Sequence, residues 1–244
     1  MPTDNTTKPP YNADESSMLI SYFELRTAIG IIGIALPFVL MLGVTVIRLA
    51  LPNALGAQHS MSEYYYTGMG NVFVGSLCAI GVFLGAYRGY DRDYIAGRIA
   101  CACSIGVALF PVSPDPNYLD LRRFVGFFHY AFAATLFLTL AYFCLKLFIK
   151  THPKDSDKPQ KQEEMTPRKL TRNKIYWVCG RVILVCIAVI GVSEGLFLNH
   201  WSPFESDFVK GLSLVYWFES LAVIAFGFSW LVKGEFILGD VKKS

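Results

Sequence analysis

The chain has 244 residues, of which 53% are hydrophobic and only 17% are charged, and its formal net charge is +3. A typical soluble domain has about 25% charged residues, so this composition excludes a soluble globular enzyme. The apolar residues are gathered in long runs, which also excludes a disordered protein. We therefore expect an integral membrane protein.

Six apolar runs are candidates for membrane-spanning helices, because about 20 apolar residues cross a hydrocarbon core of roughly 30 Å. In chain order they are residues 28–50, 69–87, 96–112, 124–148, 175–198 and 208–232. The third run is the weakest, since a stretch this short also fits a re-entrant segment. We count it as a span because the loop charges alternate correctly only if it crosses. The predicted fold is an all-α transmembrane helix bundle with six spans.

Basic residues indicate the orientation of the spans, since Lys and Arg accumulate on the cytoplasmic side of a membrane. The loops 51–68 and 199–207 contain no Lys or Arg, whereas residues 146–174 contain nine. We therefore expect both termini in the cytoplasm and a multi-pass protein of the bacterial cell (inner) membrane.

The predicted spans divide the chain into five parts. These are a cytoplasmic tail (1–27), a four-span part (28–148), a basic cytoplasmic linker (149–174), a two-span part (175–232) and a second cytoplasmic tail (233–244). Residues 151–174 are polar and charge-dense, and each basic residue near an anionic lipid surface contributes about 1 kcal/mol of attraction. The expected partners are the lipid bilayer and the anionic lipid headgroups at this linker. A docking site for a protein partner is the alternative, and no nucleic acid is expected.

Ionisable side chains inside a span are costly and are therefore candidate functional residues. Arg181 and Lys210 lie near span ends and can reach the interface, but His129, Glu194 and Glu219 cannot be explained in that way. From a rise of 1.5 Å per residue, His129 and Glu194 lie about 7 and 6 Å below the outer ends of their spans. Glu219 lies about 16 Å down, near the midplane.

The last predicted span carries a polar stripe on one helical face. Lys210, Ser213, Tyr216, Glu219 and Ser220 follow the three- and four-residue spacing of such a face. A polar stripe against lipid is expensive, so we expect it to face the bundle interior. With two acidic residues of the outer loops, it predicts a polar cavity open to the extracytoplasmic side. The candidate cavity residues are His129, Glu194, Glu219, Tyr216, Ser213, Glu63 and Asp120. The alternative is that these groups only join helices through buried hydrogen bonds.

Motifs for metal or cofactor chemistry are missing from the sequence. It contains no glycine-rich phosphate loop after a strand, no HExxH, no GxSxG and no paired CxxC. The four histidines are scattered at His59, His129, His152 and His200. A zinc site built from His129, His200 and a carboxylate is therefore the weakest hypothesis. We expect no bound metal and no cofactor, and a function other than catalysis is favoured.

Three stretches are distinctive when taken together. They are Ser62–Gly68 followed by Asn71–Gly75, then Tyr87–Asp93, and finally Glu219 with Phe226–Gly234. This pattern resembles small bacterial multi-span inner-membrane proteins of unknown function. The resemblance implies a bacterial inner-membrane setting over nearly the whole chain, and it transfers no activity.

Three functions follow in order of preference. The first is the handling of a small molecule, a lipid or an ion in a cavity open to the extracytoplasmic side. The second is a non-enzymatic scaffold or accessory subunit of a membrane complex, contacted through residues 151–174. The third is a membrane-embedded metal hydrolase.

Overall fold

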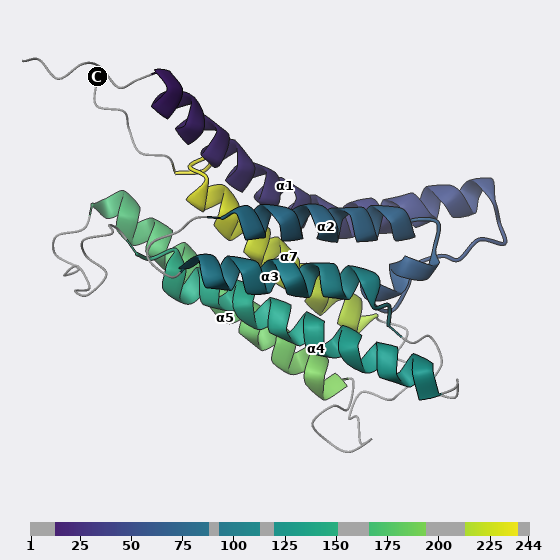
Figure 1. The fold of residues 1–244 in the computed structure, drawn as a ribbon. Coiled ribbons are helices and arrows are strands. Elements are labelled where there is room, and N and C mark those ends of the chain that lie inside the picture. Colours follow the sequence, from purple (N-terminus) through teal and green to yellow (C-terminus); the bar gives the residue numbers. More distant parts are fainter. Residues whose placement is uncertain (1–12, 88–92, 113–119, 151–165, 194–212, 239–244) are drawn as a thin grey trace, which may run out of the picture.

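The computed structural model describes residues 13–87, 93–112, 120–150, 166–193 and 213–238. Over these ranges the chain forms helices, turns and short connections, without β-strands (Figure 1). In chain order, the elements are α1 (Ala13–Ala50), the 3-10 helix η1 (Ser62–Tyr66), α2 (Gly70–Ala86), α3 (Asp93–Leu109), α4 (Asp120–Tyr142), the π-helical turn η2 (Phe143–Leu147), α5 (Pro167–Ser193) and α7 (Leu214–Lys233). Each of the six predicted runs therefore overlaps a helix.

Four helices in the described part of the chain are long and apolar enough to cross a membrane, and the protein is therefore an integral membrane protein. They lie at Phe23–Ala50, Phe124–Leu147, Pro167–Ser193 and Leu214–Lys233. Helices α2 and α3 have 17 residues each. At 1.5 Å per residue such a helix is about 26 Å long, slightly short of a hydrocarbon core of roughly 30 Å.

The helices close into a ring in which each packs against its neighbours in the chain. Figure 1 shows consecutive helices running back and forth, and α7 completes the ring by lying against both α5 and α1. The residues buried at the centre come from every helix and from the η1 segment. Examples are Leu40 on α1, Leu84 on α2, Ala100 on α3, Ile183 on α5 and Trp230 on α7.

Helices α1 and α7 approach each other closely at a pair of glycines. A Cβ atom added to Gly227 would lie 2.7 Å from the carbonyl oxygen of Gly30, and one added to Gly30 would lie 2.8 Å from that of Gly227. The two glycines therefore allow the backbones to touch, as small residues do at membrane helix interfaces.

Two helices begin well before the residues predicted by hydropathy alone. Helix α1 begins at Ala13, within the predicted N-terminal tail, and α5 begins at Pro167, within the predicted linker. Polar helical turns can continue beyond a hydrocarbon core because backbone hydrogen bonds are satisfied within the helix wherever it lies. Pro37 lies inside α1, where it removes a backbone donor and bends the helix, and Figure 1 shows α1 changing direction part-way along its length.

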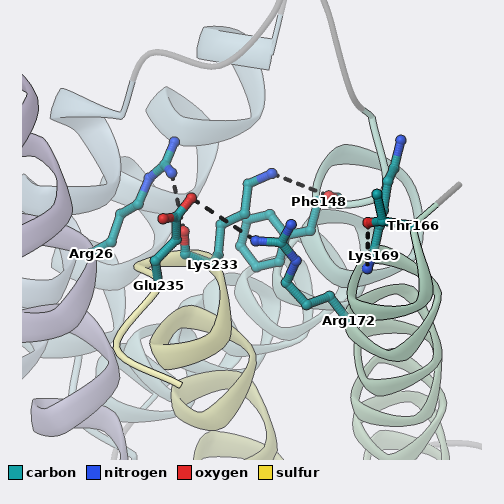
Figure 2. A network of polar contacts seen from close by, with 7 residues as sticks. All are labelled: Arg26, Phe148, Thr166, Lys169, Arg172, Lys233 and Glu235. Carbon is teal, nitrogen blue, oxygen red and sulfur yellow. Dashed lines mark hydrogen bonds and ion pairs between the residues drawn. The ribbon is translucent and has the colours of Figure 1, made fainter. Parts of the chain in front are cut away.

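Basic side chains gather where α5 begins and α7 ends, beside Arg26 of α1, and we call this the basic end of the bundle (Figure 2). Arg26 donates to the carbonyl oxygen of Lys233 at 3.1 Å, and the Lys233 ammonium donates to the carbonyl oxygen of Phe148 at 3.1 Å. Arg172 forms an ion pair with Glu235 at 3.9 Å. These bonds link α1, α5, α7 and the segment after η2 at one level of the bundle.

The basic end also contains a second ion pair, between Lys150 and Asp93. The ammonium and the carboxylate oxygen are 2.6 Å apart, and the Asp93 side chain is only 5% exposed. It joins the start of α3 to the residues just after η2.

Candidate binding cavity

A cavity of about 150 Å³ lies at the end of the bundle opposite the basic end. Its walls come from one face of α4, from α5 and from the first turns of α7, and the connection between α1 and α2 covers it. The polar lining residues are His59, Ser60, Ser62, Glu63, His129, Tyr130 and Glu219. The apolar lining residues are Val112, Ala133, Ala134, Phe137, Ile187, Ile190, Gly191 and Val215.

The connection formed by residues 59–66, which we call the cover segment, is bonded to the helices beneath it. The Glu219 carboxylate accepts the backbone N–H of Met61 at 2.6 Å, and the N–H of Tyr216 donates to the carbonyl oxygen of His59 at 2.8 Å. Tyr66 donates its hydroxyl to the carbonyl oxygen of Val112 at 2.8 Å. The cover segment is therefore attached to α7 at two points and to the chain after α3 at a third.

Tyr64 anchors the middle of the cover segment. Its side chain is fully buried, and its ring centroid lies 5.7 Å from that of Tyr216 on α7. Burial raises the pKa of the Tyr64 hydroxyl, so this group stays neutral at physiological pH.

His129 joins three segments through its two ring nitrogens. Nδ1 lies 2.6 Å from the carbonyl oxygen of Phe110, and Nε2 lies 2.9 Å from the hydroxyl of Ser62. A carbonyl oxygen only accepts, so Nδ1 carries a proton, and in the neutral ring Nε2 accepts from the Ser62 hydroxyl. With 2% of its surface exposed, this histidine is placed to hold α4, the end of α3 and the cover segment together.

Glu63 is oriented by a local pattern of the capping-box type. The Ser60 hydroxyl accepts the N–H of Glu63 at 3.2 Å, and the Glu63 carboxylate accepts the N–H of His59 at 2.9 Å. A capping box formed by Ser-x-x-Glu has the same Ser bond, but its Glu accepts from the N–H of the Ser itself, whereas Glu63 accepts from the preceding residue, His59. The two bonds hold a carboxylate at the mouth of the cavity.

Glu219 lies nearer to the end of its helix than the expected depth of about 16 Å. That depth assumed a helix from residue 208, whereas α7 starts at Leu214 after Ser213, which has a left-handed backbone (φ 48°). Glu219 is therefore about 7.5 Å into α7 at 1.5 Å per residue. At this depth the carboxylate is level with the cover segment and meets a backbone amide.

The structure brings three of the seven candidate residues to this cavity, namely Glu63, His129 and Glu219. Tyr216 faces α1 instead, where its hydroxyl donates to the carbonyl oxygen of Pro37 at 2.6 Å. Ser213 precedes α7 and is not among the lining residues. Glu194 lies outside the described residues, as does the side chain of Asp120.

The candidate residues predicted from the sequence did not include the backbone and hydroxyl groups of the cover segment. The Ser60-x-x-Glu63 spacing was the one available signal for a structured turn there. Nothing in the sequence marks the pairing of Met61 with Glu219, because the donor is a backbone amide.

A second, apolar cavity of about 60 Å³ lies deeper, at the centre of the ring. It shares Ser62, Ala133, Phe137 and Glu219 with the first cavity. Apart from Ser104, its other walls are apolar side chains of α1, α2, α3, α4, α7 and the cover segment, such as Leu36, Leu77 and Phe226. The two cavities therefore lie next to each other, the first under the cover segment and the second nearer the bundle centre.

Among the residues that the structure describes, no group of three or more His, Cys, Asp and Glu side chains is arranged to hold a metal ion. His59 and His129 do line the same cavity, but both nitrogens of His129 already have partners. Comparisons of the chain with protein-family models, with curated proteins and with solved structures found no match. The resemblance to small bacterial membrane proteins stays a prediction, and the function has to be argued from the cavity itself.

Proposed function

We propose that this integral membrane protein binds a small molecule, a lipid or an ion in the cavity beneath the cover segment, which is open to the extracytoplasmic side. The supporting observation is the cavity of about 150 Å³ that combines two carboxylates with an apolar wall. Ligand sites typically are concave and mostly apolar, with a few placed polar groups.

We also propose six spans, with both termini in the cytoplasm of a bacterial cell (inner) membrane. The support is the distribution of charge. The basic end carries Arg26, Lys150, Arg172 and Lys233, and no Lys or Arg is among the described residues lining the cavity. Lys and Arg favour the cytoplasmic side, so the cavity end would face outward.

Cysteine labelling tests the cavity and its orientation together. Ala133 lines both cavities, while Ala131 on the same helix is exposed and lines neither. A thiol reacts as the thiolate and needs water. A membrane-impermeant maleimide added outside intact cells should therefore label Ala133→Cys and leave Ala131→Cys and the parent chain, with its six cysteines, unlabelled.

Either of two results would count against the proposal. Equal labelling at positions 131 and 133 would mean that the cavity is no more accessible to water than the lipid-facing side. Labelling of Ala133→Cys only after the cells are opened would reverse the proposed orientation.

A contact role for residues 151–174 is the second candidate function. Arg168 and Lys174, at the start of α5, are exposed to solvent, which suits an anionic lipid surface or an acidic protein partner. Replacing residues 151–165 by a neutral linker and reversing the charge of Arg168 and Lys174 should remove co-purifying partners or bound anionic lipid. Unchanged co-purification would leave this candidate without support.

A further inference from the structure

One exposed face of α5 carries two basic side chains and a tryptophan. Lys174, Trp177 and Arg181 follow at intervals of three and four residues, which places them on one side of the helix. All three are exposed. Because α5 is long and apolar enough to cross a membrane, an exposed face of this helix meets lipid in a bilayer. A charged side chain in hydrocarbon is costly, so these basic groups have to reach the headgroup layer.

The side chain of Arg181 points toward the basic end of the bundle. Its guanidinium carbon lies 3.6 Å from the centroid of the Trp177 ring, four residues nearer the start of α5. Helical side chains are inclined in this direction. Arg181 is six residues beyond Ile175, where the predicted apolar run begins, or about 9 Å along the axis. Reaching back by four residues, or about 6 Å, brings the guanidinium to the level of Trp177, and tryptophan is enriched at the membrane interface.

The contact with Trp177 leaves Arg181 able to bind an anion. At 3.6 Å the guanidinium lies against the face of the ring, whereas its five N–H donors point outward in the plane of the group. This planar fork matches two oxygens of a phosphate. The stacking also restricts a long side chain before any ligand arrives, which lowers the entropy cost of binding.

The rest of this face suits the other parts of a phospholipid. Lys174, two helical turns before Arg181, adds a second positive charge on the side of Trp177 nearer the helix start. Beyond Arg181 the face becomes apolar, and the exposed fractions of Leu184 and Val185 are 39% and 59%. An anionic headgroup between the two basic side chains would therefore have its hydrocarbon beside exposed apolar side chains.

We propose that this face of α5 binds an anionic phospholipid, with the phosphate at Arg181 and Lys174 and an acyl chain along Leu184 and Val185. A zwitterionic lipid brings an ammonium group with its phosphate, and both basic side chains repel that ammonium. The inference does not depend on the cavity. It shares Lys174 with the contact proposed for residues 151–174, whereas Trp177 and Arg181 lie beyond that segment.

Helix α3 offers a matched control. Arg98 is also exposed, and its guanidinium carbon lies 4.9 Å from the centroid of the Tyr94 ring, again four residues nearer the helix start. Seven positions before Arg98 the sequence has Asp91, where α5 has a lysine seven positions before Arg181. Loss of Arg98 therefore removes an exposed, stacked arginine without changing the charge on α5.

Quenching of Trp177 fluorescence by brominated lipids tests the inference. The full chain is reconstituted into phosphatidylcholine vesicles that contain dibrominated phosphatidylglycerol or, at equal mole fraction, dibrominated phosphatidylcholine. The Trp177→Phe chain gives the contribution of the other tryptophans, of which the sequence has three. From the quenching at increasing mole fraction, the affinity for phosphatidylglycerol should exceed that for phosphatidylcholine by about fivefold or more, the factor expected for one basic residue at an anionic surface.

Matched variants assign the preference to this face. Arg181→Gln and Lys174→Gln should each reduce the ratio of the two affinities by about fivefold. Arg181→Lys should keep part of the ratio, since it retains the charge and loses the planar fork. Arg98→Gln should leave the ratio unchanged.

Three results would overturn the inference. Equal quenching of Trp177 by the two brominated lipids would mean a lipid-facing surface without charge preference. No quenching by either lipid would mean that protein covers the face, and the mass of the purified protein in detergent would then show whether a second copy does so. A ratio unchanged in both Arg181→Gln and Lys174→Gln would place the preference elsewhere. If Arg181→Gln does not fold, an unchanged ratio in Lys174→Gln is sufficient to overturn the inference. None of these results bears on the labelling of Ala133→Cys, so the cavity proposal stands or fails separately.

Discussion

The side chain of Glu219 accepts a hydrogen bond from the backbone amide of Met61 at 2.6 Å, across 158 positions of sequence. The bond ties α7 to the cover segment that closes the cavity. It places a carboxylate at the junction of the two cavities, since Glu219 lines both. The same side chain therefore holds this end of the bundle together and lines the proposed binding cavity.

Removal of this bond should destabilise the protein. Glu219→Leu leaves the Met61 amide without its carboxylate, and hydrogen bonds to charged groups contribute about 1.5–3 kcal/mol. Glu219→Gln keeps a carbonyl oxygen that can accept the same bond, so we expect a smaller loss. Thermal unfolding in detergent should rank the chains as parent, Glu219→Gln, then Glu219→Leu, with Glu24→Leu close to the parent. A Glu219→Leu protein as stable as the parent would show that the bond contributes nothing.

His129 and Ser62 should show energetic coupling. Their side chains are 2.9 Å apart, and both are buried. We expect His129→Ala to cost more than Ser62→Ala, because it also removes the partner of the Phe110 carbonyl. In a double-mutant cycle measured by denaturant unfolding, the coupling free energy should be about 0.5–1.5 kcal/mol. Strictly additive losses would mean that the bond seen in the structure has no net effect on stability.

The helices were predictable because their signal is local. An apolar run of 17 to 25 residues must satisfy its own backbone in lipid, and only a helix does so within one segment. The six runs therefore overlap the helices of the structure. The ends of the helices were harder to predict, because α1 and α5 continue through polar residues, which a hydropathy pattern does not assign to a span.

The candidate site was predictable only in part, because its geometry depends on long-range contacts. Glu63, His129 and Glu219 were found from their charge inside or beside a span. Their arrangement depends on how the cover segment folds back, and two of its contacts to α7 use backbone groups of Met61 and His59. Such groups occur at every residue, so no pattern marks them. Tyr216 shares the polar face of α7 but donates to Pro37, which no spacing predicts.

The contact of α1 with α7 should be sensitive to a single methyl group. A Cβ atom at Gly227 would lie 2.7 Å from the carbonyl oxygen of Gly30, whereas one at Gly75 would have no atom within 4 Å. We expect Gly227→Ala to lower stability by about 1–3 kcal/mol through overpacking. Gly75→Ala should be neutral or slightly stabilising, because alanine is the better helix former by about 1 kcal/mol. Thermal unfolding of both variants in one detergent compares them, and equal effects would contradict the close approach of the two helices.

The ion pair at the basic end should also contribute to stability, and a neighbouring lysine provides the control. Lys150 lies 2.6 Å from Asp93, which is 5% exposed, while Lys146 is exposed on the same segment and has no ion pair among the described residues. Lys150→Met removes the cation that is paired with this buried carboxylate. Because the Lys150 side chain is 33% exposed, we expect a cost of about 1–3 kcal/mol, below that of a fully buried pair.

Two further variants distinguish the loss of the pair from the loss of a lysine. Lys146→Met should change stability by less than about 0.5 kcal/mol, as exposed substitutions usually do. Asp93→Asn in the Lys150→Met background should recover part of the loss, since it removes the buried charge that Lys150→Met leaves behind. If the double variant is no more stable than Lys150→Met, the loss of stability does not come from burying the Asp93 carboxylate without Lys150. The contact between α3 and the segment after η2 would then depend on apolar packing.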